Sequence, residues 1–150
     1  MVFTLLVLNF LNPFMVQPSV AKRTPKTLYT FDDVTYLKNS DADTITFNIN
    51  GLHPMLGKKI SIRVKGIDAP ESRSKVPCEK ELSRRGRRLV ESMLKNAKTI
   101  KLDNAERGKY FRIVADVIVD GTNLKDVLLK NKLAVIYDGG RKLASGFCTH

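Results

Sequence analysis

The segment from Ile60 to Glu71 reads Ile-Ser-Ile-Arg-Val-Lys-Gly-Ile-Asp-Ala-Pro-Glu, and the expected fold is built around it. Apolar and polar residues alternate in its first half, which indicates a half-buried strand with Arg63 on the polar face. A glycine and a proline then end the strand in a turn, where the carboxylates of Asp68 and Glu71 follow. Such a group of charges suits a site for phosphate and a metal ion; a solvated strand face with an acidic turn is the alternative.

Further alternating runs on both sides of this segment predict more strands with short connections. The alternation is clearest over residues 44–49 and 110–119. Turn-forming residues occupy 40–43, and Asp120-Gly121 is a hairpin signal. The expected strands cover residues 28–39, 44–49, 58–67, 98–102 and 110–119, with loops at 51–57 and 103–108.

Helical spacing replaces alternation in two places. Apolar residues predict an amphipathic helix over 78–95, with Gly86 on its apolar face, where close packing would explain a glycine. A shorter helix is expected over 124–132, with Asn123 as its N-cap. Five strands with a helix inserted after the third predict a mainly β (α+β) fold, a closed five-stranded OB barrel with the helix over one open end. A Rossmann-like arrangement fits less well, because strands and helices do not alternate and no Gly-rich phosphate loop is present.

The composition favours a soluble domain with a polyanionic partner. The chain has 150 residues, which predicts one domain, and a net charge of +11. Such a surplus is typical of proteins that bind nucleic acid or an anionic membrane surface, and a basic protein without such a partner is the alternative. The two histidines, His53 and His150, are too scattered to indicate a histidine metal site.

The N-terminal residues 1–21 carry no charged side chain and resemble a secretory signal peptide. Small residues at Ser19 and Ala21 predict cleavage after Ala21 and export to the periplasm or out of the cell. No basic residue precedes the apolar run, so an uncleaved anchor is the alternative. The expected organisation is a signal peptide at 1–21, a lead-in and first strand at 22–39, an OB-fold domain at 40–137 and a tail at 138–150.

Cys78 and Cys148 form an even pair in a chain that is expected to reach an oxidising compartment. A disulfide between them would tie the tail to the start of the long helix and stabilise the fold by about 4 kcal/mol, less any native strain. Two buried thiols are the alternative.

Three segments together resemble the signature segments of the thermonuclease, or staphylococcal-nuclease-like, family. They read Asp41-Ala42-Asp43-Thr44, the stretch from Arg63 to Glu71, and Lys109-Tyr110-Phe111-Arg112-Ile113-Val114-Ala115. The resemblance implies an OB-fold, calcium-dependent phosphodiesterase that acts on DNA and RNA and leaves 3′-phosphates, as a monomer without a stable protein partner. Secreted bacterial members look similar in their C-terminal cysteine, which supports the pairing of Cys78 with Cys148.

The resemblance also implies a role for individual residues. The implied calcium ligands are Asp43, Asp68 and the backbone carbonyl of Ala69. The residues implied to contact the scissile phosphate are Arg63 and Arg112, and the implied general base for the attacking water is Glu71. The implied nucleotide contacts are Lys109 and Tyr110.

Some positions depart from the family pattern, for which altered packing rather than lost catalysis is expected at Phe111, and other functions also remain open. Ala42 and Phe111 stand where glycine is frequent in the family, and Gly108 stands where well-known members carry an acid. The main alternative is a catalytically inactive OB-fold protein that binds nucleic acid. A surface protein anchored by its N-terminus and attracted to acidic lipid or polysaccharide is a further alternative.

Overall fold

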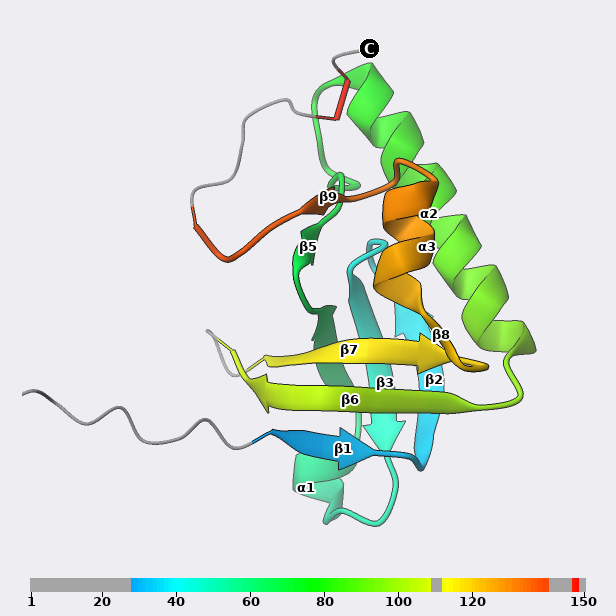
Figure 1. The fold of residues 1–150 in the computed structure, drawn as a ribbon, viewed down its shortest axis with the longest axis vertical. Coiled ribbons are helices and arrows are strands. Elements are labelled where there is room, and N and C mark those ends of the chain that lie inside the picture. The colour runs from blue at the N-terminus through cyan, green and yellow to red at the C-terminus, as the bar shows by residue number, and fades with distance from the viewer. Residues whose placement is uncertain (1–27, 109–111, 141–146, 149–150) are drawn as a thin grey trace, which may run out of the picture.

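The computed structural model describes residues 28–108, 112–140 and 147–148 (Figure 1). The expected signal peptide and the Lys109-Tyr110-Phe111 segment lie outside the described residues. The strands are β1 Tyr29–Phe31, β2 Val34–Asn39, β3 Thr44–Ile49, β4 Ile60–Val64, β5 Ile67–Asp68, β6 Ile100–Arg107, β7 Ile113–Val119, β8 Thr122–Asn123 and β9 Val135–Ile136. The helices are α1 Pro54–Gly57, α2 Pro77–Asn96 and α3 Leu124–Lys130.

The main sheet has the strand order β1-β6-β7-β4-β3-β2, with β8 added to β7. Only two residues separate β1 from β2, so the two ends of this path are halves of one interrupted strand. The sheet therefore curls so that its first strand borders both β3 and β6. If β1 and β2 count as strand 1, then β3, β4, β6 and β7 are strands 2, 3, 4 and 5. The five strands then follow the order 1-2-3-5-4-1, in which β4 and β7 are parallel. This mainly β barrel with inserted helices confirms the expected OB-type fold.

The core lies on the inward face of this curled sheet. Every second residue of β3 is buried, and the same alternation continues along β4 and β7. Because side chains alternate between the faces of a strand, the residues between them point outward. The inward residues include Ile45, Phe47, Ile49, Ile62, Val64, Ala115, Val117 and Val119.

Helix α2 packs against β2 with one apolar face, as the spacing predicts. Its buried positions are Ser83, Gly86, Val90 and Leu94. A Cβ atom at Gly86 would lie 2.9 Å from the Cβ of Ala42, which is closer than two side chains approach each other. Close packing therefore explains the glycine. The residue packed against Gly86, Ala42, belongs to the loop between β2 and β3 rather than to the sheet.

The second expected helix is also present. Asn123 caps α3, because its side-chain oxygen accepts a hydrogen bond from the Lys125 backbone amide at 3.0 Å. Leu124 and Leu128 bury the inner face of α3. The turn before it has positive φ at both Asp120 and Gly121, as a two-residue hairpin requires.

Three segments differ from expectation. The expected loop at 103–108 is instead the second half of β6, which contains a bulge where Asn104 adopts a φ of +50°. The expected loop at 51–57 contains the short helix α1. The expected strand 58–67 ends at Val64, and after a turn at Gly66 the chain pairs as β5 with β9 in a separate two-stranded sheet.

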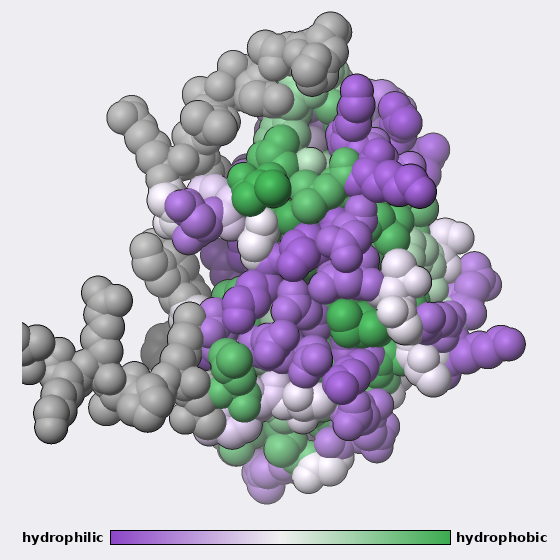
Figure 2. Space-filling model, in the orientation of Figure 1, coloured by the Kyte–Doolittle hydropathy of each residue, from purple (hydrophilic) through white to green (hydrophobic). Residues whose placement is uncertain are grey.

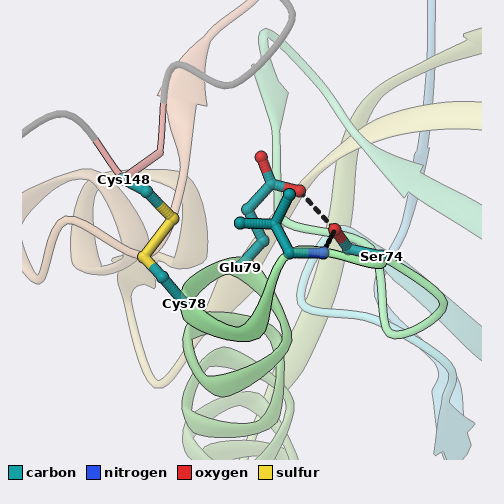
Figure 3. The surroundings of a disulfide bond; sticks show 5 residues. Ser74, Cys78, Glu79 and Cys148 are labelled. Atoms are coloured by element: carbon teal, nitrogen blue, oxygen red, sulfur yellow. Dashed lines mark hydrogen bonds between the residues drawn. A yellow bond between two sulfur atoms is a disulfide. The ribbon is translucent and has the colours of Figure 1, made fainter.

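The expected disulfide between Cys78 and Cys148 is present, with an S–S distance of 2.09 Å (Figure 3). It joins the described end of the tail to the first turn of α2. Beside it, Ser74 donates a hydrogen bond to Glu79 and accepts one from the Val76 amide, which fixes the entry into the helix. Within the described part of the chain, no helix has the length and apolar character needed to cross a membrane.

Candidate active site

Arg63 bridges two carboxylates that come from separate parts of the chain. Its Nη2 atom lies 3.1 Å from Oδ2 of Asp43 and 2.6 Å from Oδ1 of Asp68. The exposed fraction of the side chain is 5% for Asp43, 9% for Asp68 and 21% for Arg63. The structure therefore brings together three of the residues that the sequence selected, in a largely buried cluster.

The barrel topology explains why these residues meet. In the antiparallel pair of β3 and β4, Thr44 lies opposite Arg63, so Asp43 is held beside the arginine. Gly66 has a φ of +78° and turns the chain back after β4. The returning segment β5 then places Asp68 beside the same guanidinium. The Tyr137 amide, which follows β9, donates a hydrogen bond to the Gly66 carbonyl at 3.0 Å and fixes this turn.

Asp43 is the most buried acid of the cluster. It accepts hydrogen bonds from the Thr44 hydroxyl at 2.9 Å and from the Ala69 backbone amide at 3.1 Å. Burial nevertheless raises the pKa of Asp43 above its ordinary value, because desolvation outweighs the opposing effects of Arg63 and these hydrogen bonds. A further positive charge close to Asp43 would therefore stabilise its ionised form. Sequence reasoning gave no role to Thr44, although it belongs to the quoted motif.

Arg112 and Glu71 lie in segments that adjoin those of the cluster. Arg112 directly precedes β7, whose residues Ile113 and Val114 lie opposite Ile62 and Arg63 of the parallel strand β4. By the alternation of strand residues, Arg112 and Arg63 belong to the same outward face of the barrel. Glu71 is exposed and follows Asp68 by three residues. The predicted roles of both residues, and those of Lys109 and Tyr110 outside the described residues, remain predictions.

The donor set around Arg63 fits a hard cation. Two carboxylates converge on one guanidinium nitrogen, which shows that a single positive charge at this point can contact both. Calcium prefers six to eight oxygen ligands, and water and backbone carbonyls commonly complete the set. Among the described residues, no group of three or more His, Cys, Asp or Glu side chains is placed to hold a metal ion. Further ligands would therefore be backbone oxygens, such as that of Ala69, and water.

The outward face beside the cluster is also strongly polar. Lys65 lies 3.8 Å from Glu106, and Lys125 lies 3.5 Å from Asp116. In the orientation of Figure 1, hydrophilic side chains cover much of the middle of the molecule (Figure 2). In both of these pairs a lysine lies beside a carboxylate, so the two charges partly offset each other.

Comparison with known proteins places the chain in a family. Residues 61–145 match the family model described as staphylococcal nuclease homologue. The matched range contains Arg63, Asp68, Glu71 and Arg112, whereas Asp43 precedes it.

Named relatives show similarity over part of their length. The chain is 31% identical over 123 residues to Endonuclease YncB of Bacillus subtilis (strain 168), covering 77% of this chain and 54% of that protein. It is 31% identical over 123 residues to SPbeta prophage-derived endonuclease YokF of the same organism, covering 77% and 38%. It is 37% identical over 93 residues to Staphylococcal-like nuclease CAN1 of Arabidopsis thaliana, covering 60% and 27%. The chain thus spans about half of these relatives, or less. Because the family model matches more than half of the chain, we conclude that the chain belongs to the staphylococcal nuclease homologue family.

Proposed function

We propose that this chain is a calcium-dependent, sugar-nonspecific nuclease that hydrolyses phosphodiester bonds of DNA and RNA to 3′-phosphate products. The observation that carries the proposal is the convergence of Asp43 and Asp68 on Arg63, since it joins the acidic and basic groups that phosphodiester hydrolysis needs. Family membership supports it, and relatives named as endonucleases support the same reaction class.

Each group of residues in the site has a separate proposed role. In this proposal, Asp43, Asp68 and the Ala69 carbonyl hold the calcium ion, which when bound neutralises the phosphate charge and orients water. Glu71 takes the proton of the attacking water. Arg63 and Arg112 bind the phosphate oxygens, for which a planar guanidinium is suited. In this proposal the calcium ion takes over the contacts that Nη2 of Arg63 makes with the two carboxylates, which leaves the whole guanidinium for the phosphate oxygens.

The proposed partners and location follow from charge and cysteine chemistry. The net charge of +11 favours a polyanionic substrate, and Lys109 and Tyr110 are proposed to contact the nucleotide. The disulfide between Cys78 and Cys148 supports a final location in an oxidising compartment, in agreement with the proposed signal peptide at residues 1–21. We expect a monomer that acts without a membrane.

Digestion of nucleic acid tests the proposal directly. Purified protein is incubated at neutral to alkaline pH with plasmid DNA or with RNA, in calcium or in a chelator, and the product ends are analysed. We expect cleavage only in calcium, with 3′-phosphate ends, and we expect Glu71→Gln to abolish turnover while it retains DNA binding. Asp126→Asn, a change at an exposed position of α3, is the control and should be as active as wild type.

The same assay separates the alternatives. Intact DNA and RNA under both conditions would refute nuclease activity. Intact nucleic acid together with tight binding, unchanged in Glu71→Gln, would instead establish a binding protein on the nuclease fold. Cleavage in chelator would retain the nuclease reaction and refute the proposed calcium requirement.

A further inference from the structure

One loop of the barrel holds both ends of the loop that carries Glu71. The hairpin loop, residues 40–43, joins β2 to β3, and the base loop, residues 69–72, follows β5. The first residue of the base loop donates its backbone amide hydrogen bond to the hairpin loop, as described above. At the other end, Oδ1 of Asp41 accepts a hydrogen bond from the Ser72 amide at 3.1 Å. The backbone on both sides of Glu71 is therefore attached to the same support.

The hairpin loop is itself rigidly held. Asn39 is 9% exposed, and its side-chain amide donates to the carbonyl of Asp41 at 3.3 Å and to the carbonyl of Arg87 in α2 at 3.1 Å. Ala42 packs so closely on α2 that only a glycine, Gly86, fits opposite it. The Asp41 side chain therefore extends from a loop that is fixed to both the barrel and the long helix.

Two further features restrain the backbone of the base loop. The Pro70 side chain is less than 2% exposed, and its ring fixes one backbone torsion. The Ser74 amide donates to the Glu71 carbonyl at 3.1 Å. The contact at Ser72 is thus one of the backbone contacts that set the position from which the exposed Glu71 side chain extends. This position matters because a general base must lie within about 3 Å of the proton it takes, and a misplacement of about 1 Å can cost about 100-fold in rate.

We propose that Asp41 is a positioning residue for Glu71: by accepting the Ser72 amide, it fixes the backbone from which the base extends. This inference rests on the proposed function and adds a residue to it. Two other roles for Asp41 make different predictions. As a source of negative charge for the cation, it would need to be ionised, and as a purely structural residue it would affect stability without a selective effect on turnover. The positioning role needs only an oxygen acceptor at the right place.

Paired substitutions separate these roles. Asp41→Asn keeps the Oδ1 acceptor and removes the charge, whereas Asp41→Ala removes both. We expect kcat to fall about 10- to 100-fold in Asp41→Ala, while KM and the calcium Kd change less than about threefold. Asp41→Asn should keep kcat within about fivefold of wild type. Asp33→Ala is the matched control, since Asp33 accepts a hydrogen bond from Asn50 at 2.7 Å at the opposite end of the same hairpin.

A second measurement does not depend on catalysis. Hydrogen exchange of the Ser72 amide in calcium-free protein should be at least about tenfold faster in Asp41→Ala than in wild type, and unchanged in Asp41→Asn. Wild-type kcat in Asp41→Ala would overturn the proposal, as would unchanged exchange at Ser72. Equal loss of kcat in both variants together with weaker calcium binding would overturn it in favour of the charge role. If wild type itself cleaves no nucleic acid, the proposed function fails first and the positioning role fails with it.

Discussion

Replacing Arg63 by glutamine should destabilise the calcium-free protein more than any exposed arginine does. In the structure, the guanidinium contacts both Asp43 and Asp68 through one nitrogen atom. The substitution leaves these two acids close together and largely buried without their shared cation. The pKa of Asp43 is already raised by burial, so the loss of Arg63 removes the largest effect that opposes the shift.

The size of the effect follows from burial. Removing one partner of a buried ion pair costs about 3–5 kcal/mol, because the remaining charge stays buried and unpaired. Arg63 keeps 21% of its side chain exposed, and Asp43 retains its hydrogen bonds from Thr44 and Ala69, so the loss should lie at the lower end of this range or slightly below it. We expect a loss of about 2–3 kcal/mol. At about 4 °C per kcal/mol for a domain of this size, Tm should fall by about 8–12 °C.

Thermal unfolding followed by circular dichroism, in chelator at neutral pH, measures this loss. Arg84→Gln is the matched control, because the Arg84 side chain is 57% exposed and pairs with Glu81 on the surface of α2. Exposed pairs contribute about 0–1 kcal/mol, so its Tm should change by no more than about 4 °C. If Arg63→Gln and Arg84→Gln unfold at the same temperature, Arg63 does not hold the buried acids in solution.

The same unfolding measurement, repeated in calcium, tests whether calcium and Arg63 bind the same two carboxylates. Calcium at about 100 times its Kd stabilises the folded state by about 2.7 kcal/mol. If calcium and the Arg63 guanidinium compete for the same two carboxylates, Arg63→Gln should bind calcium at least as tightly as wild type and recover most of its lost Tm. Weaker calcium binding in Arg63→Gln would contradict this competition, and no calcium effect on either protein would remove the proposed cation site.

Three further predictions concern the scaffold. Gly86→Ala should cost about 1–3 kcal/mol of unfolding free energy in urea despite the better helix propensity of alanine, because its Cβ would meet Ala42, and adding Ala42→Gly should recover most of the loss. The backbone amide of Thr99 holds the pKa of Asp120 below its ordinary value, so the carboxylate stabilises the fold above about pH 4 and loses this effect as pH falls through the lower folded-state pKa. The urea midpoint of Asp120→Asn should therefore lie below that of wild type at pH 7 and approach it in acid; a difference independent of pH would contradict this. Replacing both Cys78 and Cys148 by serine should cost up to about 4 kcal/mol, and wild type in reductant should show the same loss.

Local pattern was sufficient to predict the elements wherever alternation is unbroken. Residues 44–49 alternate without exception, and β3 has the expected bounds. In β6, by contrast, the bulge at Asn104 places the buried residues Leu102 and Ala105 three positions apart instead of two. A polar segment without a period of two resembles a loop, so the expected strand, 98–102, is shorter than β6. The error comes from one residue with positive φ, which is not predictable from hydrophobic spacing.

The site was predictable only in part, for a similar reason. Alternation placed Arg63 on the outward face, and family resemblance selected Asp43 and Asp68, but no spacing rule states that one guanidinium nitrogen contacts both acids. The contact between Asp41 and Ser72 joins a turn to a loop 31 positions later, and neither segment has a period to reveal it. Contacts of this kind depend on how the barrel closes, so they become visible only in the folded chain.

The hairpin loop connects the proposed base, which is exposed, with the buried acid pair. Asp43 and Asp41 are two positions apart in the hairpin loop, and their side chains reach the two ends of the base loop. Asp43 is buried beside Arg63, whereas Asp41 is half-buried and accepts a hydrogen bond from the Ser72 backbone amide. The same short loop therefore sets the position of the proposed cation ligands and that of the proposed base. The residues that hold this loop in place, Asn39 and Gly86 of α2, therefore contribute to the geometry of the proposed site.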